Sequence, residues 1–110
     1  MRIGLIGGVE RSEATYRDIA ERAGHRLYFH SGHVGGRGSD TLAALARSVD
    51  LLIVVTDVNS HGAVQLARRA AREHNVPLAL YRRCSPARLA AIVAGLSSDW
   101  PLAAGASANG

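Results

Sequence analysis

Short apolar runs that alternate with longer amphipathic segments constrain the fold of this chain more than any other feature. Leu51–Val55 is an unbroken apolar run of strand length and is rich in β-branched residues, as expected of a strand buried on both faces of a sheet. Similar short runs alternate with helical segments along most of the sequence. This alternation predicts parallel strands joined by right-handed crossovers. We therefore predict an α/β fold: a small doubly wound, Rossmann-like or flavodoxin-like, four-stranded parallel sheet in the order 2-1-3-4.

Capping and turn residues predict where these elements begin and end. The expected strands are Arg2–Ile6, Arg26–His30, Leu51–Val55 and Leu78–Arg82, and the expected helices are Glu13–Ala23, Ser39 or Asp40 to about Arg47, Ser60–His74, and Ser85-Pro86 to about Leu96. Ser12 is the expected N-cap of the first helix and Gly24 its C-terminal stop. Asn75 and Pro77 are expected to end the third helix, and residues 31–38 form a glycine-rich loop.

The composition fits one globular domain. Of the 110 residues, 47% are hydrophobic, so we assign residues 1–96 to a single α/β domain and the Ala-, Gly- and Ser-rich residues 97–110 to a flexible tail. The net charge of +4 is weak evidence for an anionic partner, but no nucleic-acid-binding motif is present, so no nucleic acid is expected. The sequence contains no apolar run of membrane-spanning length and no signal peptide, so no membrane partner is expected, and a cytoplasmic location follows by default.

His61 is the strongest candidate for a functional side chain, and specifically for a metal ligand. It follows the buried run Leu51–Val55 and opens a helix, and ligands of parallel α/β sheets bind beyond the carboxyl ends of the strands. Imidazole is also the commonest metal ligand in proteins. On a helical wheel Gln65, Arg68 and Arg72 share a stripe with His61, while four alanines occupy the opposite arc and should face the sheet. An ordinary solvated helix face is the alternative explanation of this stripe.

The spacing along this stripe suits haem. Arg68 and Arg72 lie roughly 10 and 16 Å from His61 along the helix axis. A planar cofactor with a central iron and peripheral carboxylates has about these dimensions, and histidine ligation with arginines on the propionates is a common solution. We therefore predict that His61 ligates haem iron, that Arg68 and Arg72 pair with the propionates, and that Gln65 lies beside the cofactor. His30 or His33 would supply a second axial ligand or a distal hydrogen bond.

An outward-facing stripe cannot enclose a haem within one subunit, so a partner is required. A sheet of four strands also has two open edges, and such edges are commonly covered or paired between subunits. We therefore expect a homodimer. The loop at residues 31–38 is a candidate hinge for exchanging elements between its subunits.

Several of these segments resemble the bacterial "domain related to iron" family, which is catalogued largely as a domain of unknown function. The matching segments are Gly7-Gly8, His30-Ser31-Gly32, Thr56–His61, Arg72–Pro77 and Arg82–Ser85, and they span roughly residues 1–95. The family is associated with haem binding, and the resemblance implies that His61 and Arg72 hold the cofactor. Gas or redox sensing and haem handling are the roles considered, and haem-dependent oxygen chemistry stays open.

Two alternative functions depend on other residues. Cys84, the single cysteine, precedes a helix whose dipole could lower its pKa, as in a phosphoryl or redox enzyme. The phosphatase spacing nevertheless fails, because Ala90 stands where an arginine is needed. Asp57 ends the third predicted strand, as in receiver-like signalling domains, but the chain has glycines after its first strand where receivers need acidic residues. The same glycines do not match the dinucleotide-binding fingerprint.

Overall fold

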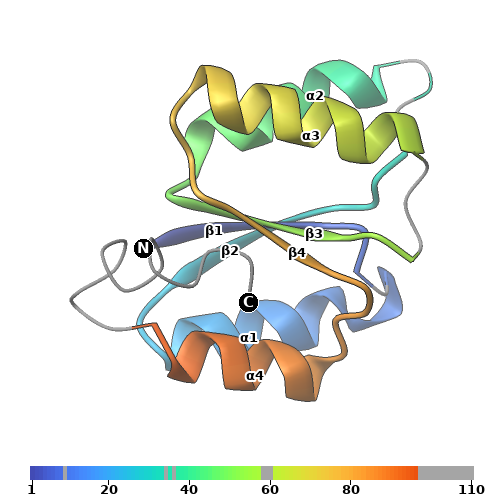
Figure 1. The fold of residues 1–110 in the computed structure, drawn as a ribbon. Helices are drawn as coiled ribbons and strands as arrows, with labels where there is room; N and C mark the ends of the chain where they lie inside the picture. Colours follow the sequence, from blue (N-terminus) through green and yellow to red (C-terminus); the bar gives the residue numbers. More distant parts are fainter. Residues whose placement is uncertain (9, 34, 36, 58–60, 97–110) are drawn as a thin grey trace.

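The computed structural model describes residues 1–8, 10–33, 35, 37–57 and 61–96, and Figure 1 shows their arrangement. The elements in chain order are β1 (Arg2–Ile6), the short 3-10 helix η1 (Glu10–Ser12), α1 (Glu13–Arg22), β2 (Arg26–His30), α2 (Gly38–Ser48), β3 (Leu51–Val55), α3 (His61–Glu73), β4 (Leu78–Tyr81) and α4 (Pro86–Ala94). The predicted tail at residues 97–110 lies outside the described residues, so the proposed domain boundary stays a prediction.

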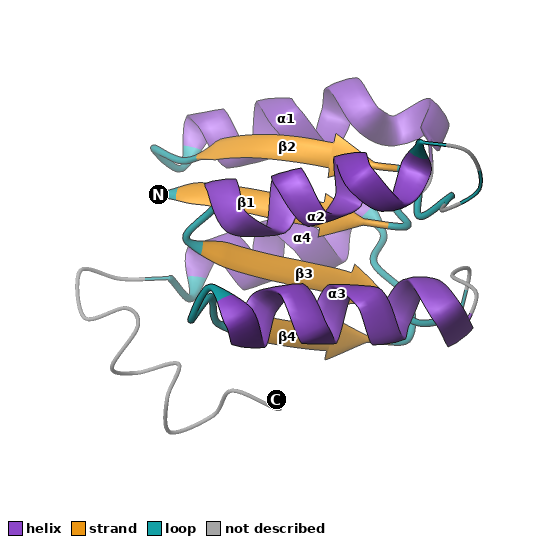
Figure 2. Ribbon diagram, turned by 90° about the horizontal axis from the view of Figure 1, so that it is seen from above, coloured by secondary structure: helices purple, strands orange, loops and turns teal. Residues whose placement is uncertain are grey.

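The strands form one parallel sheet in the order β2-β1-β3-β4. In Figure 2 all four arrows point the same way, so the carboxyl ends of the strands share one edge of the sheet. Helices α2 and α3 cover one face, and α1 and α4 cover the other (Figure 1). The predicted doubly wound α/β fold and its strand order are therefore confirmed.

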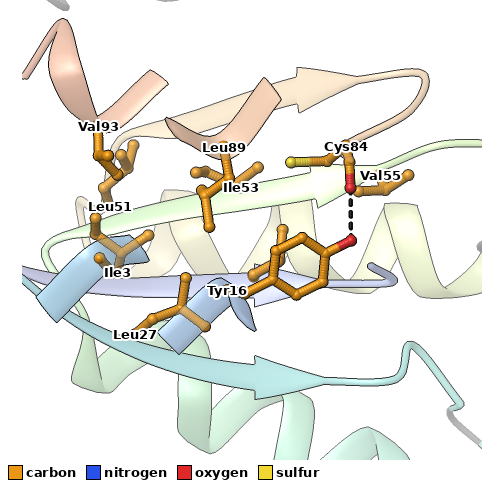
Figure 3. Packing of buried hydrophobic residues seen from close by; sticks show 11 residues of the cluster. Ile3, Tyr16, Leu27, Leu51, Ile53, Val55, Cys84, Leu89 and Val93 are labelled. Carbon is orange, nitrogen blue, oxygen red and sulfur yellow. Dashed lines mark hydrogen bonds between the residues drawn. The ribbon is translucent and has the colours of Figure 1, made fainter. Parts of the chain in front are cut away.

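The core has two layers because successive side chains of a strand point to opposite faces. In β3, Leu51, Ile53 and Val55 belong to the cluster under α1 and α4, whereas Leu52 and Val54 belong to the cluster under α2 and α3. All five residues are buried, which explains why this strand appears in the sequence as an unbroken apolar run. Figure 3 shows the first layer, in which side chains of α1 and α4 meet those of β1 and β3.

The fully buried side chains of helix α3 are all small, and the partly buried Val64 and Leu66 pack beside them. Its buried residues are Ala63, Ala67, Ala70 and Ala71, the four alanines that the helical wheel places toward the sheet. Helix α3 ends at Glu73, one residue before the predicted His74. Asn75 follows with a φ of 54°, and the N–H of Val76 donates to the carbonyl of Ala71. This left-handed turn is a common helix ending and confirms the predicted stop.

Several helix boundaries differ from the sequence prediction, and the expected side-chain caps do not form at two of them. Ser12 makes no side-chain capping hydrogen bond, and η1 runs directly into α1 instead. Helix α2 begins at Gly38, earlier than Ser39 or Asp40, with Arg37 in the N-cap position and no side-chain cap. At Gly38 an added Cβ would overlap the carbonyl of His33, so the close approach of the loop requires glycine at this position.

The end of the chain also differs in extent. Strand β4 stops at Tyr81, one residue before the predicted end at Arg82, and α4 stops at Ala94, two before Leu96. The predicted start of α4 is confirmed, because Ser85 Oγ accepts a hydrogen bond from the N–H of Arg88 at 3.1 Å. None of the described helices is long and apolar enough to cross a membrane.

Candidate functional site at the carboxyl edge of the sheet

His61 is the first residue of α3 and its side chain is exposed. The alanines on the opposite side of the helix hold α3 against the sheet, so the imidazole extends away from the core. Its Nε2 lies 3.2 Å from the side-chain Nε2 of Gln65, one turn further on. An amide nitrogen can only donate, so the ring accepts through Nε2 and carries its proton on Nδ1. Gln65 therefore orients the ring in this structure.

Arg68 and Arg72 continue the exposed stripe along α3. Among the described residues neither guanidinium makes an ion pair. A helix rise of about 1.5 Å per residue keeps them at roughly 10 and 16 Å from His61 along the axis. The structure thus brings His61, Gln65, Arg68 and Arg72 to one solvent-facing surface.

His30 lies elsewhere on the same edge and holds the loop before α2. The N–H of Gly32 donates to His30 Nδ1 at 2.9 Å, so the ring donates from Nε2 to Thr41 Oγ1, also at 2.9 Å. The Thr41 hydroxyl in turn donates to the carbonyl of Gly38 at 3.0 Å. The pKa of His30 is lowered from its ordinary 6.5, mainly because the ring is partly buried. Both ring nitrogens are engaged, so iron ligation by His30 would break a hydrogen bond.

His33 is exposed in the same loop, where its N–H donates to Ser31 Oγ at 3.3 Å. Strand β1 separates β2, which carries His30, from β3, which leads to His61. Two strand spacings amount to about 9–10 Å. No hydrogen bond joins His30 or His33 to His61 within the described part of the chain. Their role as a second axial ligand stays a prediction.

Cys84 is a poor candidate for a nucleophile. Only 4% of the residue is exposed, and burial raises the pKa of the thiol, an effect that the nearby Arg88 opposes only in part. A thiol with a raised pKa carries little thiolate near neutral pH. The structure therefore argues against the cysteine-based enzyme.

An arginine cluster lies at the end of β4, in a segment that the sequence analysis names without giving its arginines a role. The Nε of Arg82 lies 3.6 Å from Asp57 Oδ1, and the Nε of Arg83 lies 3.2 Å from Asp57 Oδ2. The guanidinium of Arg88 lies over the ring of Tyr81, 5.8 Å from its centroid. The signal was available in the sequence: Asp57 and Arg82 each follow a strand, and neighbouring parallel strands end side by side.

Within the described residues, no group of three or more His, Cys, Asp and Glu side chains is arranged to hold a metal ion. The segment between Asp57 and His61, which belongs to the predicted site block, lies outside these residues. Of the predicted metal ligands, His61 is the one that α3 presents with an exposed ring and a nitrogen held only by a neighbouring side chain.

Comparison with known proteins gives the family of the chain. Residues 2–96 match the model of a family described as "Uncharacterized protein conserved in bacteria (DUF2325)", and the chain belongs to this family. The resemblance to the "domain related to iron" family is therefore wrong, since the match is to an uncharacterized family and nothing in it indicates haem. No curated protein matches the chain, and no solved structure does.

Proposed function

We propose that this member of an uncharacterized bacterial family binds haem, with His61 as the ligand of the iron. The observation that carries the proposal is the exposed imidazole at the start of α3, beyond the carboxyl end of β3. Ligand sites of parallel α/β sheets are found at this edge. One protein imidazole suffices for iron when a porphyrin supplies the equatorial donors. Gln65 must turn its amide away from Nε2 when that nitrogen ligates iron.

The charges along α3 fit the carboxylates of the cofactor. Arg68 and Arg72 are exposed and, among the described residues, are not neutralised by an acidic side chain. Arginine forms bidentate, charge-assisted hydrogen bonds with carboxylates. When bound, haem supplies an iron centre for redox chemistry or for gas ligands. We place the function in gas or redox sensing or in haem handling.

A homodimer would complete this site, because α3 presents its stripe to solvent. The two outer strands support this expectation, since β2 and β4 are the edges of the sheet and carry half-buried apolar side chains such as Phe29 and Leu80. Unpaired edge strands commonly pair with another chain. Exchange of elements through the loop at residues 31–38 stays a prediction, and Val34 and Gly36 of that loop lie outside the described residues.

A hemin titration of the purified protein tests the proposal. We expect saturable binding with a Soret band that His61→Ala abolishes or shifts. The matched control is His74→Ala, because His74 is an exposed histidine just beyond the other end of α3. An unchanged Soret band in the His61 variant, or an equal loss in both variants, would remove His61 from the proposed role.

The arginines and the dimer have separate tests. The double variant Arg68→Gln/Arg72→Gln should weaken hemin binding about two- to fivefold, as expected for exposed ion pairs, without changing the Soret position. The double variant Arg17→Gln/Arg22→Gln removes the same charge from α1 and should bind as the parent does. Light scattering should give twice the monomer mass with hemin present, and a monomeric haem complex would contradict the dimer.

A further inference from the structure

The arginine cluster at the end of β4 lines a hollow of about 520 Å³, separate from the stripe on α3. Its described lining residues are Leu80, Tyr81, Arg82, Arg83 and Arg88. Three of these five side chains are cationic and none is acidic. Small-molecule sites span about 300–1,000 Å³, so the hollow has the size of a site for a compact ligand.

Asp57 gathers two of the three cations. Successive residues of an extended chain point to opposite sides, yet Arg82 and Arg83 both reach the same carboxylate because β4 has ended at Tyr81. Each arginine contacts Asp57 through Nε, so the terminal Nη groups of both remain available to a ligand. Their side chains are 86% and 88% exposed. Asp57 is thus a positioning residue that holds two guanidinium groups side by side.

The charge balance of the hollow favours an anion. One carboxylate, Asp57, meets two arginines, and Arg88 adds a third positive charge over the ring of Tyr81. The exposed arginines of α1 differ, because Arg17 and Arg22 each pair with an acidic residue four positions earlier. The charges of Arg17 and Arg22 are each balanced by one carboxylate, whereas the three arginines of the hollow share a single carboxylate and leave a surplus of positive charge.

We propose that Arg82, Arg83 and Arg88, arranged by Asp57, bind the phosphate group of a small phosphorylated metabolite. The planar fork of arginine matches phosphate oxygens, and adjacent guanidinium groups can share a multiply charged group. Leu80 and Tyr81 are the apolar residues of the lining and are half-buried, so the organic part of the ligand would contact them. The described lining comes from residues 80–88 alone and shares no residue with the stripe on α3, which favours a small molecule over a nucleic acid.

Pyrophosphate is a suitable probe, and NMR of the ¹⁵N-labelled protein at constant ionic strength is a suitable measurement. We expect saturable shifts of the Tyr81–Arg88 amides. The double variant Arg82→Gln/Arg83→Gln should bind pyrophosphate about fivefold or more weakly, because two exposed charge-assisted contacts to a multiply charged group are lost. The control Arg17→Gln/Arg22→Gln also loses two paired arginines and should bind within about twofold of the parent. Equal weakening in both variants, or no saturable binding, would overturn the proposal.

Two further measurements test the positioning role of Asp57 and the chemical class of the ligand. Asp57→Ala makes the hollow more positive, so simple attraction would tighten pyrophosphate binding, whereas loss of the arranged arginines would weaken it. Tighter binding would overturn the positioning role. A single-stranded oligonucleotide that binds more tightly than a mononucleotide would overturn the assignment to a small metabolite. His61→Ala should leave pyrophosphate binding unchanged, which keeps this proposal distinct from haem binding.

Discussion

Replacing Tyr16 by phenylalanine removes one oxygen atom and tests how α1 holds the start of α4. Tyr16 is 0% exposed, and its hydroxyl donates to the carbonyl of Cys84 at 2.6 Å, a contact that Figure 3 shows. The ring stays packed against Phe29, with centroids 6.2 Å apart. The variant therefore leaves the packing in place and deprives a carbonyl in the first core layer of its donor.

The expected loss follows from this geometry. A buried polar group left without its partner costs about 1–3 kcal/mol, so the free energy of unfolding should fall by that amount. Urea unfolding followed by circular dichroism would measure it. Tyr28→Phe is the matched control, because Tyr28 is only half-buried, and it should change the free energy by less than about 0.5 kcal/mol. Equal effects of the two variants would refute the role of the Tyr16–Cys84 hydrogen bond.

Three further predictions concern pH, a glycine and the thiol. Burial lowers the pKa of His30 and of His25, so their stabilisation is complete above pH 6.5 and is lost as the pH falls through the lowered values. Urea titrations between about pH 5 and 7.5 should show this fall, and His30→Gln should flatten it; an unchanged slope would contradict the His30 contribution. Gly38→Ala should lower the free energy of unfolding by about 1–3 kcal/mol, because the added Cβ meets the loop carbonyl of His33. Its melting temperature should fall accordingly, and an unchanged melting temperature would contradict that overlap. Cys84 should react slowly with a thiol reagent in the folded protein and rapidly in urea, and rapid reaction in both states would contradict its burial.

The sequence predicted the sheet because a buried parallel strand has a strong local signature. Leu51–Val55 needs apolar side chains on both faces, and the alanine arc of α3 needs small ones against the sheet. Both patterns arise from burial alone, so they can be recognised in the sequence without knowledge of the tertiary structure. The helix starts were less predictable. Helix α2 begins at Gly38, where the loop carbonyl of His33 leaves no room for a Cβ, and sequence spacing contains no record of that contact.

The candidate site was predictable only in part, for a similar reason. The exposed position of His61 follows from the periodicity of its own helix. The engagement of His30 depends on Thr41, which belongs to another element. The arginine cluster depends on Asp57, which lies 26 positions before Arg83. To predict such pairings one needs the strand order and register as well as the residue types. The predicted strand order places β3 beside β4, so it could have revealed the pairing of Asp57 with Arg83.

The polar groups at the amino ends of the strands differ from those at the carboxyl ends in the partners that they contact. At the amino edge the polar groups satisfy one another: the N–H of Arg2 donates to Asp50 at 2.7 Å, and the amino group of Met1 lies 2.9 Å from His25 Nδ1. These pairs join neighbouring elements at the amino ends of the strands. At the carboxyl edge the terminal nitrogens of Arg82 and Arg83 remain available. A ligand can use the hydrogen-bond donors that remain available at the carboxyl ends of the strands. Substitutions at Asp50 should therefore lower the free energy of unfolding, whereas substitutions at Arg82 should weaken ligand binding.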